Sequence, residues 1–98
     1  MLTCEKVLEV FTEYLKEDRA CEVVNTSRGY TVMVWDNCQK DWDISQVAPS
    51  PEALRDILLD NYEIYLIYKM TDECKRDSLT GQEKKKIEAM CRDLRERC

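Results

Sequence analysis

The sequence predicts a small α+β domain: an N-terminal helix, then an antiparallel meander of two or three strands, then two or three helices. Apolar residues recur at spacings of three and four near both ends of the chain, which is typical of amphipathic helices. Between residues 21 and 47, runs of β-branched and aromatic residues alternate with turn-forming residues, which is typical of strands. With 98 residues, of which 44% are hydrophobic, the chain has material for one modest core. We therefore expect a single compact domain over residues 1–98.

The first helix is expected over residues 4–18. Its apolar face consists of Cys4, Val7, Leu8, Phe11, Tyr14 and Leu15. Its opposite face carries a glutamate at every fourth position, namely Glu5, Glu9, Glu13 and Glu17. In one uninterrupted helix these carboxylates form a single row with steps of about 6 Å, similar to the distance between successive phosphates of a DNA strand.

Two strands, over residues 21–26 and 30–36, are expected to form a hairpin. Between them, Gly29 supplies the positive φ that a tight turn requires. The second strand is apolar on both faces, so we predict that it is the central strand and packs against the helix. Residues 42–47 are predicted to add a third strand to the meander.

A second helix is predicted over residues 51–60, with Ser50 as its N-cap and Pro51 at its first position. Residues 62–70 are ambiguous. Their apolar residues alternate as in a strand, yet Asp60 and Glu63 resemble a capping box, and we favour a further helix.

The last helix is predicted to run from Thr80 to about residue 97. Thr80 and Glu83 form a capping box at its start. Residues 72–79 are expected to be a polar connector.

Helix stability does not explain the glutamate row. Like charges four residues apart each destabilise a helix by roughly 0.2 to 0.5 kcal/mol, and Glu13 and Glu17 lie toward the negative end of the helix dipole. Within the helix only Lys6 and Lys16 offer counter-charge. We interpret the row as a surface that binds a basic partner; the alternative is an ordinary solvated face.

A second acidic group surrounds a tryptophan in the loop between the second and third strands, and consists of Asp36, Asp41, Trp42 and Asp43. Clustered carboxylates suit hard cations, and an enzyme that uses Asp36, Asp41 and Asp43 with a divalent ion is one hypothesis. The loop lacks the glycine and the terminal glutamate of a calcium loop, however, so we expect no metal. We interpret the four residues as an extension of the partner-binding surface, with Trp42 as an aromatic anchor. The other interpretation is that both tryptophans belong to the core, and by composition alone we favour the core for Trp35 and, more narrowly, for Trp42.

The negative charge is concentrated in the first two-thirds of the chain. Residues 1–68 contain 6 Lys and Arg against 13 Asp and Glu, whereas residues 69–98 contain 9 against 7, which gives the net charge of −5. An acidic surface repels phosphate backbones and attracts basic surfaces, so we expect a basic protein partner and no direct binding of nucleic acid. No apolar stretch approaches the roughly 20 residues that span a bilayer, so we expect no membrane association.

Six cysteines are present and histidine is absent. No two cysteines have the spacing of a zinc knuckle, so we expect neither a metal nor a cofactor. The chain has no export signal, and we therefore expect a cytoplasmic protein with reduced thiols. Cys4, Cys91 and Cys98 lie on apolar helix faces and are interpreted as small core residues, whereas Cys38 is the expected exposed thiol.

Four segments carry a resemblance to known proteins: Ser27-Arg28-Gly29-Tyr30-Thr31-Val32, Lys40-Asp41-Trp42, Pro49-Ser50-Pro51-Glu52-Ala53-Leu54 and Tyr68-Lys69-Met70-Thr71. They resemble short accessory proteins carried on mobile elements of gut-type Gram-positive bacteria. The plan of a small acidic chain with a helix, a strand meander and further helices is also similar in style to anti-CRISPR proteins, which imitate the charge of DNA and occupy basic channels of effector nucleases. This resemblance assigns no role to any residue.

The sequence contains no glycine-rich phosphate loop and no nucleophile elbow, so we expect no catalytic residue and no enzymatic activity. We predict a non-enzymatic, acidic protein-interaction module that inhibits or regulates a basic nucleic-acid-handling protein. The alternative is a small structural accessory protein that dimerises through apolar surface and has no charge-based partner.

Overall fold

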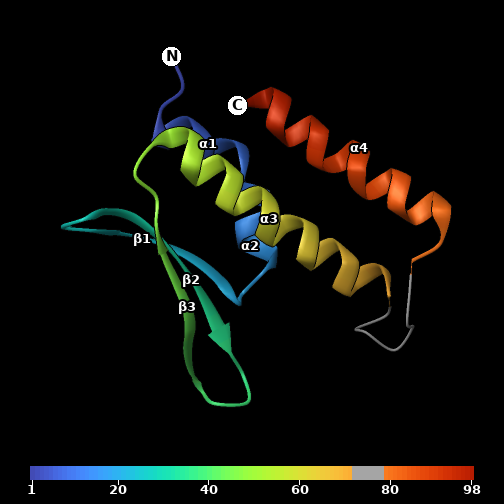
Figure 1. Ribbon diagram of the computed structural model, residues 1–98, viewed down its shortest axis with the longest axis horizontal. Helices are drawn as coiled ribbons and strands as arrows, with labels where there is room; N and C mark the ends of the chain where they lie inside the picture. Colours follow the sequence, from blue (N-terminus) through green and yellow to red (C-terminus); the bar gives the residue numbers. More distant parts are fainter. Residues whose placement is uncertain (72–78) are drawn as a thin grey trace.

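The computed structural model describes residues 1–71 and 79–98, and it has the predicted α+β fold (Figure 1). The predicted connector therefore lies almost wholly outside the described residues. The elements are α1 (Cys4–Val10), α2 (Thr12–Glu17), β1 (Cys21–Thr26), β2 (Gly29–Asp36), β3 (Asp41–Val47), α3 (Pro51–Met70) and α4 (Gly81–Arg97).

The three strands form an antiparallel sheet in the order β1-β2-β3, so β2 is the central strand as predicted. Gly29 adopts a φ of 110° at the turn between β1 and β2, as its position in the hairpin requires. Side chains alternate between the two faces of a strand. Val32 therefore points to the helices and is 1% exposed, while its neighbour Met33 points to the other face.

Helix α3 is the longest element and runs without interruption from Pro51 to Met70. The Ser50 side chain accepts a hydrogen bond from the Ala53 amide at 3.1 Å, which confirms the predicted N-cap. The ambiguous residues 62–70 are helical, but the predicted end near Asp60 is wrong.

The reason for this continuity is that the buried stripe of α3 does not stop at Asp60. Leu54, Leu58 and Leu66 share one face, because their separations of four and eight residues return to the same side of a helix. Asn61 does not end the helix, and its side-chain amide donates a hydrogen bond to the Ile57 carbonyl at 3.0 Å.

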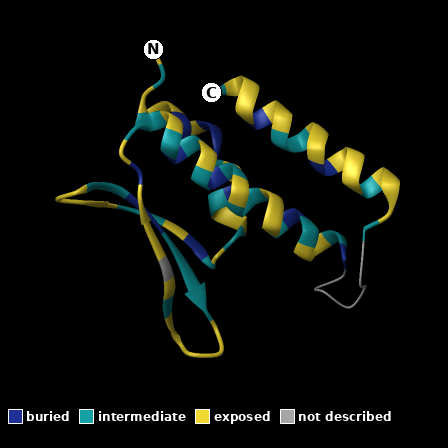
Figure 2. Ribbon diagram, viewed as in Figure 1, coloured by how far each residue is buried: buried dark blue, intermediate teal, exposed yellow. Residues whose placement is uncertain are grey.

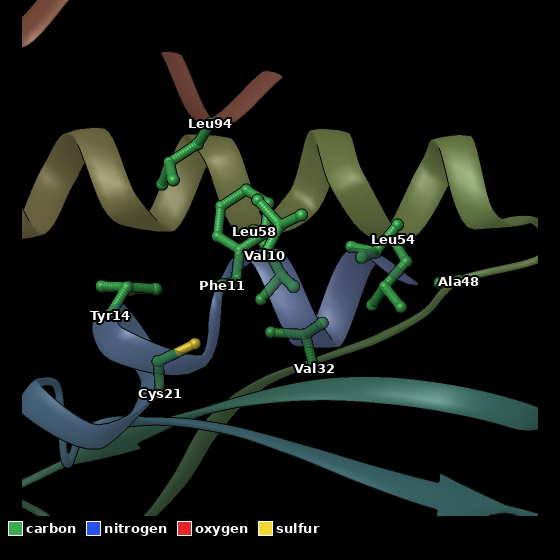
Figure 3. Packing of buried hydrophobic residues seen from close by; sticks show 10 residues of the cluster. Val10, Phe11, Tyr14, Cys21, Val32, Ala48, Leu54, Leu58 and Leu94 are labelled. Carbon is green, nitrogen blue, oxygen red and sulfur yellow. The ribbon is translucent and has the colours of Figure 1, made fainter. Parts of the chain in front are cut away.

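The core lies where α1, α2 and α3 cover one face of the sheet (Figure 3). Its fully buried side chains are Phe11, Leu54, Leu58, Val7 and Val32. Helix α4 packs along α3, inserts Leu94 toward this cluster and exposes its outer side (Figure 2). The Thr80–Glu83 capping box at its start is confirmed, with hydrogen bonds of 2.9 and 3.1 Å.

Candidate protein-binding surface

The two N-terminal helices turn four glutamates toward solvent. Thr3 caps α1, and its hydroxyl accepts a hydrogen bond from the Lys6 amide at 3.1 Å. The inner side of this segment is buried and consists of Val7, Val10, Phe11 and Tyr14. The exposed side carries Glu5, Glu9, Glu13 and Glu17. The predicted exposure of all four carboxylates is confirmed.

The prediction of one continuous helix over residues 4–18 is wrong. The segment is interrupted at Phe11, whose φ of −91° and ψ of 7° leave the helical range. The Thr12 hydroxyl donates to the Leu8 carbonyl at 2.8 Å, a bond that competes with the backbone pattern and bends helices. The glutamate row is therefore divided into Glu5 and Glu9 on α1, and Glu13 and Glu17 on α2, without the uniform spacing that a single helix would give.

Two of the four glutamates have a counter-charge. Glu9 lies 4.0 Å from Lys6 Nζ, and Glu17 lies 3.8 Å from Lys69 Nζ. Among the residues that the structure describes, Glu5 and Glu13 have no ion pair. Exposed pairs of this kind are worth about 0 to 1 kcal/mol, so a basic partner can replace either lysine at little cost in free energy.

Glu17 also faces an aromatic side chain of α3. The Tyr65 hydroxyl donates to Glu17 Oε2 at 3.3 Å, and Lys69 Nζ lies 5.3 Å from the centre of the Tyr65 ring. Burial raises the pKa of Tyr65, and Lys69 opposes this shift while Glu17 adds to it. The phenol therefore stays protonated and is the donor toward the carboxylate.

Two carboxylates of the acidic loop accept hydrogen bonds from backbone amides of the same loop. Asp36 Oδ1 accepts hydrogen bonds from the amides of Cys38 and Gln39 at 2.8 and 3.2 Å. Asp41 Oδ1 accepts from the Trp42 amide at 2.8 Å. Asp43 is exposed at the register shift where β2 and β3 change their pairing. Asp41 and Asp43 thus remain accessible to a partner, whereas Asp36 is half-buried and serves the turn.

Trp42 pairs with Trp35 across β2 and β3. The ring centres are 5.2 Å apart in an edge-to-face arrangement, and both side chains are half-buried. Strand alternation puts Trp35 on the same side as Met33, away from the helices. Neither tryptophan belongs to the buried core cluster, so the favoured core positions of Trp35 and Trp42 are wrong, and both side chains keep part of their surface exposed.

The structure does not bring the acidic loop together with α1. Figure 1 places the loop between β2 and β3 at the end of the sheet that is distant from α1. Glu5 and Glu9 on α1 are therefore apart from the predicted residues of the loop. We name Glu5, Glu9, Glu13 and Glu17 the helical acidic face, and Asp36, Asp41, Trp42 and Asp43 the loop acidic face.

A groove of about 560 Å³ between α2, α3 and α4 was not predicted from the sequence. Glu13 and Glu17 stand on its α2 side, and Lys86 and Arg97 on its α4 side. Lys84, Lys85 and Lys86 precede Ile87 in the sequence, and helical spacing alone does not indicate that Lys86 is the one that faces the groove. No local signal places α4 next to α2, because that depends on packing between segments far apart in the chain.

Among the cysteines in the described part of the chain, all but Cys38 are buried or half-buried. Cys21 is buried, while Cys4, Cys91 and Cys98 are half-buried and have their pKa raised by burial above all. Cys38 is exposed at the turn, as predicted. Within residues 1–71 and 79–98, no group of three or more Cys, Asp or Glu side chains is placed to hold a metal ion.

None of the helices in the described part of the chain combines the length and the apolar character needed to cross a membrane. Comparison with models of protein families, with curated proteins and with solved structures finds no match for this chain.

Proposed function

We propose that this chain is a non-enzymatic protein-interaction module, and that its helical acidic face binds a basic surface of a nucleic-acid-handling protein. The observation that carries this proposal is the exposure of all four glutamates on α1 and α2, two of them without an ion pair in the described chain. As part of this proposal we expect the interaction to occur in the cytoplasm, where thiols stay reduced.

The proposed partner follows from charge. A patch of carboxylates attracts a surface that is lined with Lys and Arg to hold phosphates, and it competes with nucleic acid for that surface. Because the row is broken at Phe11, the imitation of DNA is one of charge density and not of phosphate spacing. Occupation of the basic surface would inhibit or regulate the partner.

The test is a capture experiment with three baits. The first is the native chain, and the second carries Gln at positions 5, 9, 13 and 17. The third is a matched control with amides in place of four exposed acids elsewhere, at Asp60, Glu63, Glu88 and Glu96. Both variants remove four negative charges from a chain of net charge −5, so they differ only in where the charge is lost.

We expect the native bait and the control bait to capture the same basic nucleic-acid-binding protein from a nuclease-treated bacterial lysate, as identified by mass spectrometry. The helical-face variant should not capture it. The purified pair should dissociate more readily as salt is raised, and nucleic acid should displace the native chain. If both variants fail to capture the protein, net charge alone governs capture. If both variants capture it, the helical acidic face is not the binding surface.

A second candidate function is self-association through the sheet. The face of the sheet opposite the helices carries apolar side chains, and Val47 is 47% exposed there beside the half-buried Val24 and Met33. Sedimentation at several protein concentrations separates the two functions. A dimer that resists salt and is lost in Val47→Lys favours a structural role, whereas a monomer favours the acidic interaction module.

A further inference from the structure

The groove between α2, α3 and α4 has an apolar floor. The floor side chains are Tyr14, Tyr62, Leu66 and Leu94, from three different helices. Tyr14 and Tyr62 meet edge to face with their ring centres 5.1 Å apart. Helix α4 adds Met90 and Ala89 toward the rim, and Ala89 is exposed. Such a floor favours apolar side chains of a partner.

The two walls of the groove carry opposite charges. Glu13 and Glu17 line it from α2. Lys86, Arg97 and Asp93 line it from α4, with a net positive charge, and Lys69 lines it from α3. Four of these charges already have partners, because Glu17 lies 3.8 Å from Lys69 and Arg97 lies 3.7 Å from Asp93. In the described part of the chain, Glu13 and Lys86 form no ion pair. The groove therefore presents one free carboxylate on one wall and one free ammonium on the other.

The length of the groove matches a short helix. Its α4 wall extends from Lys86 to Arg97, which is about three turns, or about 16 Å at 1.5 Å per residue. The floor residues Tyr62 and Leu66 lie one turn apart on α3. A helix laid between α2 and α4 would become a further member of a helical layer, a recognition mode in which apolar anchors recur at spacings of three and four.

We propose that this groove binds an amphipathic helix of a protein partner. The apolar stripe of that helix packs on Tyr14, Tyr62, Leu66 and Leu94, a basic residue on one flank pairs with Glu13, and an acidic residue on the other flank pairs with Lys86. This site shares Glu13 and Glu17 with the helical acidic face but differs from it in chemistry, because it selects an apolar stripe with flanks of both signs and not a uniformly basic surface.

The probe is a fluorescein-labelled synthetic helix of about 16 residues, long enough for the groove. It has leucines at spacings of three and four, lysines on one flank and glutamates on the other. Two control peptides keep the leucine stripe and carry lysine on both flanks or glutamate on both flanks. Binding is measured by fluorescence anisotropy with the full chain.

We expect the mixed-flank peptide to bind with a Kd below about 100 μM and more tightly than both controls. Glu13→Gln and Lys86→Gln should each weaken it about threefold to tenfold, because each removes a facing charge. Lys85→Gln, on the adjacent exposed position outside the groove, and Glu5→Gln, on α1, should change the Kd less than about twofold.

Steric filling gives an independent readout. Ala89→Trp projects a large side chain from the exposed rim into the groove and should weaken binding at least about tenfold, whereas Gln82→Trp on the same helix should not. Circular dichroism checks that each variant is folded; if Ala89→Trp is not, the Lys86→Gln and Lys85→Gln pair decides.

The proposal is overturned if the mixed-flank peptide does not bind, if the all-lysine peptide binds best, or if groove and control variants lose affinity equally. It is also overturned if the groove variants abolish self-association of the free chain, because the occupant is then a second copy. Substitution of Glu5 and Glu9 leaves the groove intact, so failure of the helical acidic face is distinguishable from failure of the groove.

Discussion

Tyr14 and Cys21 are buried titratable side chains that meet beside Asp18. The Tyr14 hydroxyl donates to Asp18 Oδ2 at 2.7 Å, and the Cys21 amide donates to the Asp18 carbonyl at 3.2 Å. Burial raises the pKa of Cys21 from 9.0 to about 11. Burial, followed by the hydrogen bond to Asp18, raises the pKa of Tyr14 above its ordinary value of 10.0. The folded chain therefore holds both groups in their neutral, protonated forms.

This environment predicts a loss of stability at alkaline pH. A group whose pKa is raised by folding contributes its full stability below the unfolded pKa, and that stability is lost as pH rises toward the folded pKa. For Cys21 alone the free energy of unfolding should fall by about 2 kcal/mol between pH 8 and pH 11, with Tyr14 adding to the decrease.

Urea unfolding at several pH values measures this decrease, with Cys21→Ala as the comparison. The variant is less stable at neutral pH because of its lost volume, but its stability should decline less steeply above pH 9. Parallel pH profiles of the two proteins would mean that the Cys21 thiol does not contribute to the decline.

At the scale of the elements, α3 depends on its N-cap. The Ser50 hydroxyl satisfies the Ala53 amide at the start of the longest helix, which packs on α1, β2 and α4. Ser50→Ala should lower the free energy of unfolding by about 1 kcal/mol, because it leaves that amide without its partner. Ser45→Ala, at an exposed position of β3, is the matched control and should change it by less than about 0.5 kcal/mol. Urea midpoints measured side by side test this, and equal midpoints would contradict the role of the cap.

The elements that sequence patterns predicted are those whose signals are local. The turn glycine at position 29 and the capping residues Ser50, Thr80 and Glu83 each act within a few residues, so the strands and the helix starts were predictable. The bend at Phe11 was not predictable, because the apolar spacing continues across it. Phe11 would be buried whether the helix were continuous or interrupted there.

The candidate site was predictable only in part for the same reason. Exposure of the glutamates follows from their position opposite the apolar face. The contact between Glu17 and Lys69, and the groove that Glu13 and Lys86 share, join segments that are far apart in the sequence. These contacts depend on how α2, α3 and α4 pack, and the spacing of residues in the sequence does not predict that packing.

At the scale of the whole molecule, uneven charge opposes folding. The net charge is −5, and the excess of acids lies in the first two-thirds of the chain. We expect the free energy of unfolding to rise as salt is increased from low ionic strength, since salt screens repulsion among exposed carboxylates. The variant with Gln at positions 5, 9, 13 and 17 should show a weaker dependence. Urea unfolding over a salt series measures the salt dependence of both proteins. An equal dependence would mean that the repulsion arises from acidic residues other than these four glutamates.

The Trp35–Trp42 pair allows the sheet and the helices to be followed by two different spectroscopic signals. Both tryptophans of the chain belong to β2 and β3, whereas Tyr14, Tyr62 and Tyr65 cluster among the helices. Tryptophan emission therefore reports on the two-strand ribbon alone, while far-ultraviolet dichroism is dominated by the helices. Coincident melting of the two signals would indicate a single cooperative unit. A separation would reveal that the ribbon carrying the loop acidic face opens by itself, and a partner that binds there could then select the open form without disturbing the helical layer.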